Sequence, residues 1–97
     1  MFKLKWSELS LIRIEEIADF IGAYSQDNSV KFVNNLFEKT DLIQENPKIG
    51  RVVPETSIEE IREIFIENYR VVYQIQHKVI IILTVRCCLE ERNEAGL

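Results

Sequence analysis

The segment VIIILTV, residues 79–85, constrains the fold of this chain more than any other stretch. It is apolar at positions that face both sides of a strand, so both faces need cover and the strand belongs in the middle of a sheet. Residues 69–76 precede it and alternate in side-chain character, with Gln76, His77 and Lys78 as the connecting turn. The sequence therefore predicts two neighbouring strands that need further partners.

Two other segments have the pattern of strands. Residues 2–6 alternate apolar and polar side chains with a period of two. The segment IEEIREIFIE, residues 58–67, is ambiguous, because its apolar residues also match a helical spacing. We predict a strand over 61–67, since the β-rich run that follows needs a partner. Glu67 and Asn68 then form the tight turn, with Asn68 tolerating a positive φ.

The region between these strands has the spacing of two amphipathic helices. Ser7 suits an N-cap, and a helix is predicted from about residue 8 to residue 24 or 25. Residues 25–29 form a polar break, and a second helix follows that stops by Asn46, because Pro47 cannot donate to the helical ladder. The stripes expected to face the core are Leu11, Ile14, Ile17, Ala18, Ile21 and Tyr24, and Val30, Val33, Leu36, Phe37, Thr40 and Ile43.

The predicted order is β-α-α-β-β-β, an α+β fold in which a helical hairpin packs on a mainly antiparallel sheet. Residues 1–97 suit a single domain, with a weakly ordered tail from about residue 89. The corner NPKIGRVVPE, residues 46–55, returns the chain from the hairpin to the sheet. Pro47 ends the helix, Gly50 permits the turn, and Pro54 keeps the chain extended.

Composition narrows the classes of function. A net charge of −4 argues against attraction of the whole surface to nucleic acid. No apolar run is long enough to span a membrane and no signal-peptide pattern is present, so we expect a cytoplasmic protein that does not bind membranes. The adjacent Cys87 and Cys88 are expected to be free thiols. With His77 as the single histidine and no Gly-rich phosphate loop, the sequence predicts neither a metal site nor a cofactor.

Four arginines are candidates for binding an anion, because the guanidinium fork suits phosphate. They are Arg51 in the corner, Arg62 and Arg70 on adjacent predicted strands, and Arg86 at the end of the last strand. The alternative is that they pair with nearby acids, namely Glu55, Glu60, Glu63 or Glu67. Alternation places Arg70 on the sheet face opposite Tyr69 and Tyr73, which we expect in the core beneath the helices.

Three segments together resemble the RelE/ParE superfamily of bacterial toxins. They are the corner NPKIGRVVPE, the segment IREIFIENYRVVYQI and the strand VIIILTV, and the helical pattern IEEIADFI extends the resemblance over nearly the whole chain. The resemblance implies the toxin of a type II toxin–antitoxin system, held inactive by a cognate antitoxin whose extended or helical segment wraps it. We expect the antitoxin to contact an apolar groove beside the helical hairpin and the sheet edge, by helix docking or strand addition.

The superfamily contains two activities that the residues help to separate. RelE-like members cleave messenger RNA on the ribosome, with basic residues around the phosphate and a Tyr, or a Glu/His pair, for acid–base chemistry. Arg70 matches the strand arginine of the superfamily, whereas Ile61 and Glu63 stand where RelE has paired lysines. No tyrosine follows Tyr73 in the chain. Glu55 matches a carboxylate base of some relatives but lacks the histidine partner.

This pattern favours the ParE-like activity, in which the toxin binds DNA gyrase and does not cut RNA; a catalytic set is largely absent. The alternative is a ribosome-dependent mRNA endonuclease, whose site residues are then Arg70, Arg62, Arg86, Arg51 and Glu55. A third hypothesis is a non-toxic module that binds an antitoxin, suggested by the divergent end CCLEERNEAGL.

Overall fold

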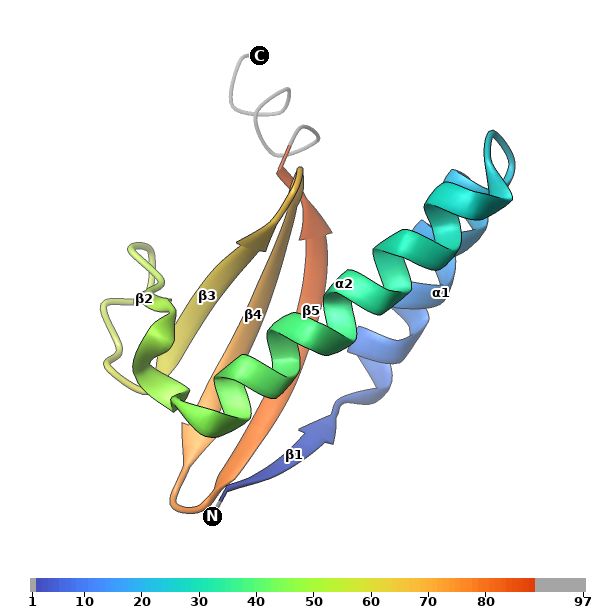
Figure 1. Cartoon of the computed structure of the whole chain (residues 1–97). Helices are drawn as coiled ribbons and strands as arrows, with labels where there is room; N and C mark the ends of the chain where they lie inside the picture. Colours follow the sequence, from blue (N-terminus) through green and yellow to red (C-terminus); the bar gives the residue numbers. More distant parts are fainter. Residues whose placement is uncertain (1, 89–97) are drawn as a thin grey trace.

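A computed structural model describes residues 2–88 of the chain. One sheet with the strand order β1-β5-β4-β3-β2 is covered on one face by helices α1 and α2 (Figure 1). This arrangement confirms the predicted α+β class and element order, to which β2 adds a short strand. The tail predicted from about residue 89 lies outside the described residues. The elements are β1 (Lys3–Trp6), α1 (Glu8–Gly22), α2 (Gln26–Glu45), the 3-10 helix η1 (Pro47–Ile49), β2 (Arg51–Val52), β3 (Ile61–Ile66), β4 (Tyr69–Gln76) and β5 (Val79–Cys87).

Strand β5 lies inside the sheet, as its apolar sequence predicted. It pairs in parallel with β1 and antiparallel with β4, and the β3–β4 and β2–β3 pairs are antiparallel. The strand continues two residues past the predicted end, to Cys87. The side chains of Ile80, Ile82 and Val85 are completely buried. The strand that most needed cover therefore has strand neighbours on both sides and contributes three residues to the core.

A register shift explains why the buried residues of β5 are spaced by two and then by three. Tyr73 lies opposite Ile82, but the preceding Val72 lies opposite Thr84, so Leu83 is an extra residue in β5. Such a bulge lets both flanking segments keep their apolar side chains on the same face. Without it, Ile82 and Val85 would point to opposite sides of the sheet.

Both helices begin at serine N-caps. The Ser7 Oγ accepts a hydrogen bond of 3.0 Å from the Ser10 N–H, and the Ser25 Oγ accepts one of 3.2 Å from the Asn28 N–H. The polar segment 25–29 is therefore mostly the first turn of α2 and not a break, since the Ser25 cap allows the helix to start at Gln26. Helix α1 ends at Gly22, before the predicted residue 24 or 25.

The two tyrosines predicted to lie in the core are found there, but some of the predicted core-facing residues of the helices are not. Tyr73 is fully buried, and Tyr69 packs against Phe32 with ring centroids 5.0 Å apart. Phe32 was missing from the predicted stripe of α2, yet it is one of the largest buried side chains. Four residues predicted to face the core are exposed instead, because the sheet covers a narrower arc of each helix than the apolar sequence spans. They are Leu11, Tyr24, Val30 and Phe37.

The tight turn between β3 and β4 occurs where it was predicted, but its strained residue is different. Glu67 has φ of 54° and Asn68 does not have a positive φ. His77, in the β4–β5 turn, has φ of 53°. The prediction that Asn68 takes this conformation was wrong, because the pairing of Ile66 with Tyr69 makes Glu67 the first central residue of the turn.

The corner after α2 is fixed by polar groups from the sheet. The Tyr73 hydroxyl donates to the Pro47 carbonyl oxygen at 2.7 Å and accepts from the Gly50 N–H at 2.9 Å. Gly50 has an ordinary φ of −79°, so its role is not the conformational freedom inferred from the sequence. A Cβ atom there would lie 2.6 Å from both the Glu63 carbonyl oxygen and the Tyr73 hydroxyl. Glycine is needed because the sheet approaches the corner so closely.

We expect Tyr73→Phe to lower the free energy of unfolding by about 1–3 kcal/mol, because the Gly50 N–H and the Pro47 carbonyl lose a buried partner. Urea denaturation at neutral pH measures the change. Tyr24→Phe, at an exposed tyrosine, is the matched control and should stay within about 0.5 kcal/mol of wild type. A loss of the same size in both variants would contradict the role of the Tyr73 hydroxyl.

The same variant has an expected pH dependence. Burial raises the pKa of Tyr73 above its ordinary value of 10.0. The folded protein thus favours the protonated hydroxyl. The contribution of Tyr73 to the free energy of unfolding is therefore complete below pH 10 and is lost as the pH rises through the folded-state pKa. The difference in unfolding free energy between wild type and Tyr73→Phe should therefore narrow above pH 10. A difference that stays constant to pH 11 would contradict this.

Candidate functional site

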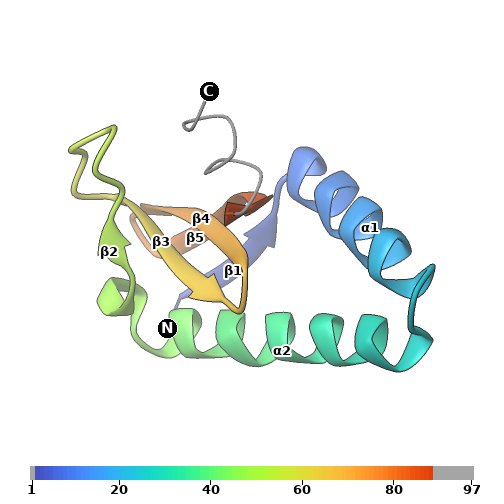
Figure 2. The ribbon, with the colours of Figure 1, turned by 90° about the horizontal axis from the view of Figure 1, so that it is seen from above.

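The face of the sheet opposite the helices carries most of the candidate arginines. Strand pairing places Arg51 opposite Glu63, Phe65 opposite Arg70, and Arg70 opposite Arg86. Figure 2 shows α2 beneath the sheet and the β2–β3 loop rising on the other side. We call the sheet face opposite the helices the open face.

Glu63 is the centre of a charge cluster on the open face. Its side chain is 0% exposed, and its two carboxylate oxygens meet cations from two neighbouring strands. The Arg51 Nε lies 2.6 Å from Oε2, and the Arg70 NH1 lies 3.1 Å from Oε1. A buried carboxylate is tolerated only when cations and hydrogen-bond donors compensate its desolvation. Arg51 supplies a charge and a hydrogen bond to Oε2, and Arg70 supplies a charge beside Oε1.

The two arginines differ in how firmly they are enclosed. Arg70 is only 14% exposed, and its NH1 also lies 3.9 Å from the Glu55 Oε2. Arg51 is 61% exposed, with its guanidinium carbon 5.3 Å from the centre of the Phe65 ring. Aromatic rings attract such cations, so the Phe65 ring is a second contact of the Arg51 side chain beside Glu63. The pair with Glu55 places that residue of the β2–β3 loop beside the cluster.

Arg62 does not belong to this cluster, because it faces the corner on the other side of the sheet. Its guanidinium donates to the Gly50 carbonyl at 2.8 Å and to the Glu59 carbonyl at 3.0 Å, and it also pairs with the Glu59 carboxylate. Opposite Arg62 in β4 is Tyr73, the other residue that holds the corner. The structure therefore separates Arg62 from Arg70, although the two lie on adjacent strands.

Arg51, Arg70, Glu55 and Arg86 lie on the open face, with Arg86 exposed to solvent. From the sequence, Glu63 was one of four possible acidic partners of the arginines and stood where RelE has a lysine. That one buried carboxylate contacts two of the arginines was not predicted, nor was the role of Phe65. The sequence signal that could have found this cluster is the alternation of side chains along each strand. Once β2 is recognised as a strand and paired with β3, alternation places residues 51, 63, 65 and 70 on one face of the sheet.

The chemistry available at the cluster is limited. The single histidine, His77, lies in the β4–β5 turn, at the opposite end of β4 from Arg70. Within residues 2–88, no three His, Cys, Asp or Glu side chains are arranged to hold a metal ion. In the same range, neither helix is long and apolar enough to cross a membrane. The cluster thus presents two arginines that bind a carboxylate, without a neighbouring histidine acid or base.

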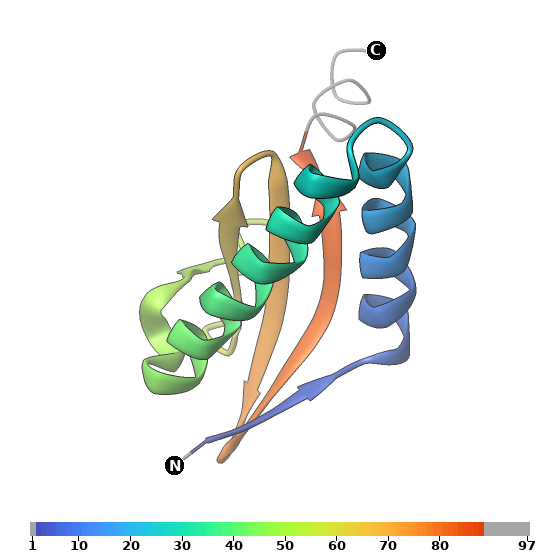
Figure 3. The same ribbon diagram turned by 45° about the vertical axis from the view of Figure 1, so that its right-hand side comes forward.

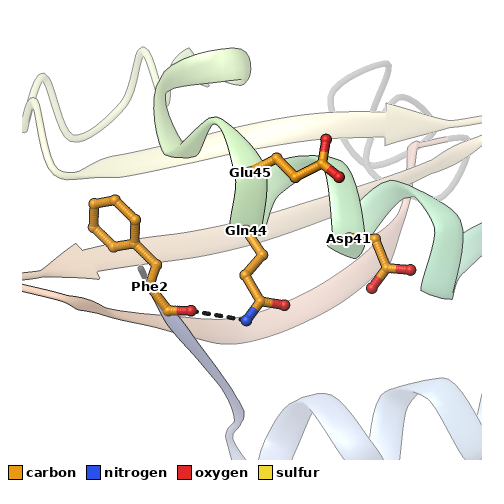
Figure 4. Close-up of a pocket in the computed structure, with 4 residues that line it drawn as sticks. All are labelled: Phe2, Asp41, Gln44 and Glu45. Atoms are coloured by element: carbon orange, nitrogen blue, oxygen red, sulfur yellow. Dashed lines mark hydrogen bonds between the residues drawn. The ribbon is translucent and has the colours of Figure 1, made fainter.

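A concave region lies between α2 and the start of β1. Its volume is about 630 Å³, and it is lined by Phe2, Asp41, Gln44 and Glu45. The Gln44 side chain donates to the Phe2 carbonyl oxygen at 2.8 Å, which joins the helix to the strand (Figure 4). Two carboxylates and an aromatic ring give this pocket an acidic and partly apolar lining.

Comparisons with known proteins agree with the resemblance seen in the sequence. A family model described as ParE toxin of type II toxin-antitoxin system, parDE, matches residues 4–91. A solved structure, the chromosomal ParDE system from P. aeruginosa, contains a chain that matches with a TM-score of 0.73 and 20% sequence identity. The match covers 90% of this chain and 96% of that chain. No curated protein matches. At this identity the solved structure supports the fold.

We expect Glu63→Gln to lower the free energy of unfolding by about 2–4 kcal/mol, because it removes the charge that compensates two arginines. Glu16→Gln is the matched control, since it breaks the exposed Arg13–Glu16 pair of 3.3 Å and should change stability by less than about 0.5 kcal/mol. Chemical denaturation at low and high salt measures both. Equal, small effects in the two variants would show that the cluster does not stabilise the fold.

Proposed function

Because the chain belongs to the ParE toxin family of type II toxin–antitoxin systems, we propose that it inhibits DNA gyrase by binding it and is neutralised by a cognate antitoxin. The observation that carries this choice is the engagement of Arg51 and Arg70 by the buried Glu63 carboxylate. Arg70, which matches the phosphate-binding arginine of RelE-like nucleases, is already in contact with the Glu63 carboxylate.

A phosphate group approaching Arg70 would meet two negative side chains. Glu63 lies in contact with the guanidinium, and Glu55 lies 3.9 Å from it. Repulsion by the Glu63 carboxylate is little screened because that side chain is buried, whereas the exposed Glu55 contributes a weaker, screened repulsion. If a phosphate took the place of the Glu63 carboxylate at the two arginines, that carboxylate would stay buried without the cations that compensate its charge. This geometry supports action through protein binding over cleavage of messenger RNA.

The experiment expresses the chain alone in bacteria and then compares two purified assays. We expect growth arrest, inhibited supercoiling with cleaved DNA trapped on gyrase, and intact ribosome-bound message, with relief on addition of the antitoxin encoded by the neighbouring gene. Cleaved message with unaffected gyrase would overturn the proposal in favour of a RelE-like endonuclease. Normal growth with soluble protein and two negative assays would leave a non-toxic module that binds the antitoxin.

A variant pair sharpens the comparison. Arg86→Ala removes an exposed arginine of the open face, whereas Arg13→Ala removes an exposed arginine of α1. If RNA is the target, we expect Arg86→Ala to reduce cleavage by about tenfold or more through lost phosphate stabilisation, with Arg13→Ala near wild type. Under our proposal neither variant produces or abolishes any cleavage, because there is none in the wild type.

A further inference from the structure

The open face carries an excess of positive charge, although the chain as a whole is acidic. Strand register and alternation assign six charged strand residues to it, one acidic and five basic: Glu63, Lys3, Lys5, Arg51, Arg70 and Arg86. Residues 8–45, which include both helices, contain eight acidic and three basic residues, a net charge of −5. Figure 3 shows both helices on one side of the sheet, so the two sides of the molecule differ in the sign of their charge.

Exposed cations lie on the two edge strands of this face. Leu4 packs against the core from the helix side, so the neighbouring Lys3 and Lys5 of β1 point the other way, and both are exposed. No carboxylate of residues 2–88 forms an ion pair with either lysine. On the opposite edge strand, β2, Arg51 binds Glu63 through Nε, and its two terminal nitrogens donate no hydrogen bond within the described range. The sheet therefore presents cations at both edges.

The strands between these edges present apolar side chains on the same face. Ile61 of β3, Val72 of β4 and Ile81 of β5 point to it and are partly exposed. Phe65, farther along β3, is 45% exposed. In residues 2–88 neither helix covers these side chains, because both helices lie on the other side of the sheet. An apolar centre with a charged rim, together with arginine and an aromatic ring, is the composition of a protein–protein interface.

We infer that the open face is the surface that binds the target protein, at a region of that protein where carboxylates surround an apolar centre. The identification of the target as DNA gyrase rests on the proposed function. Carboxylates of the target would meet Lys3 and Lys5 at one edge of the sheet and Arg51 at the other, and its apolar centre would pack on the side chains between them. The exposed Glu55 lies beside this surface and limits the positive charge at the β2 edge.

Two other occupants fit the surface less well. A nucleic acid needs cations along the path of its phosphates, whereas the middle of this face has Glu63 and apolar side chains. A second copy of the chain could offer its acidic hairpin, but the contact between one copy's open face and the next copy's hairpin is head-to-tail. Such contacts build rings or open filaments and not a two-fold dimer. A different protein with an acidic surface is the occupant that the charges favour.

The charge contact is tested by the kinetics with which the full chain binds immobilised gyrase holoenzyme in surface plasmon resonance. One variant combines Lys3→Glu with Lys5→Glu, and its matched control combines Lys31→Glu with Lys39→Glu, two exposed lysines of α2. Both variants change the net charge equally. We expect the β1 variant to associate about tenfold more slowly at low salt and the α2 variant less than about twofold. The difference should shrink at high salt, because screening weakens the attraction.

A second matched pair tests the apolar centre. Phe65→Ala removes an exposed aromatic ring from the open face, and Phe20→Ala removes one from α1, where the ring is 64% exposed. We expect Phe65→Ala to raise the Kd for gyrase by about tenfold or more, and Phe20→Ala by less than about twofold. Circular dichroism and denaturation check that each variant is folded, and the lysine variants provide an independent readout if Phe65→Ala is not.

The outcomes separate this inference from the proposed function. If wild type binds gyrase and the β1 and Phe65 variants bind equally well, the inference is wrong and the proposed function stands. Loss of binding only in the α2 and Phe20 variants would move the interface to the helices and also overturn it. The inference is equally wrong if the β1 variant loses binding to a short DNA duplex or self-association in sedimentation instead. If wild type does not bind gyrase, the proposed function fails and the inference fails with it.

Discussion

A carboxylate as buried as that of Glu63 persists only where cations reach it, and here the cations come from strands on both sides. Arg70 comes from the neighbouring β4, but Arg51 reaches Glu63 only because two residues within the corner form β2. That strand depends on the preceding part of the corner, which is held by the Tyr73 hydroxyl and the Arg62 guanidinium. The abrupt turn at residues 46–55 thus brings an arginine to a buried acid.

Much of the fold could be predicted from local sequence signals, because each has a direct physical cause. The apolar segment 79–85 required an interior strand, Pro47 required an end to α2, and Ser7 indicated the start of α1. Alternation correctly placed Tyr73 beneath the helices and Arg70 on the other face. These signals depend on properties of one segment, such as its period or a missing N–H, and not on contacts with distant residues.

The features that escaped prediction depend on contacts between distant segments. Strand β2 has two residues and no periodic pattern, so it exists through pairing with β3. The extra residue Leu83 in β5 is set by registration against β4. The exposure of Leu11 and Phe37 depends on how much of each helix the sheet covers, which their apolar spacing cannot indicate. Glu63 could be recognised as the centre of the cluster only once both arginines were placed.

The two faces of the molecule have different electrostatic characters, which bear on what each can bind. On the open face, two arginines are engaged by an internal acid, so their guanidinium groups already contact an anion within the molecule. On the helical face, apolar side chains and carboxylates are exposed to solvent. A family whose members are toxins paired with antitoxins requires binding surfaces for other proteins, and the two faces offer surfaces of opposite charge.

The Glu63 carboxylate lies where an anion would bind between Arg51 and Arg70. Nuclear magnetic resonance of the arginine Nε–Hε groups of the wild-type protein, during titration with inorganic phosphate, measures whether this place is open. We expect the Arg51 and Arg70 signals to keep their chemical shifts at millimolar phosphate. A saturable shift of both signals at that concentration would show an open phosphate site and contradict the role of Glu63.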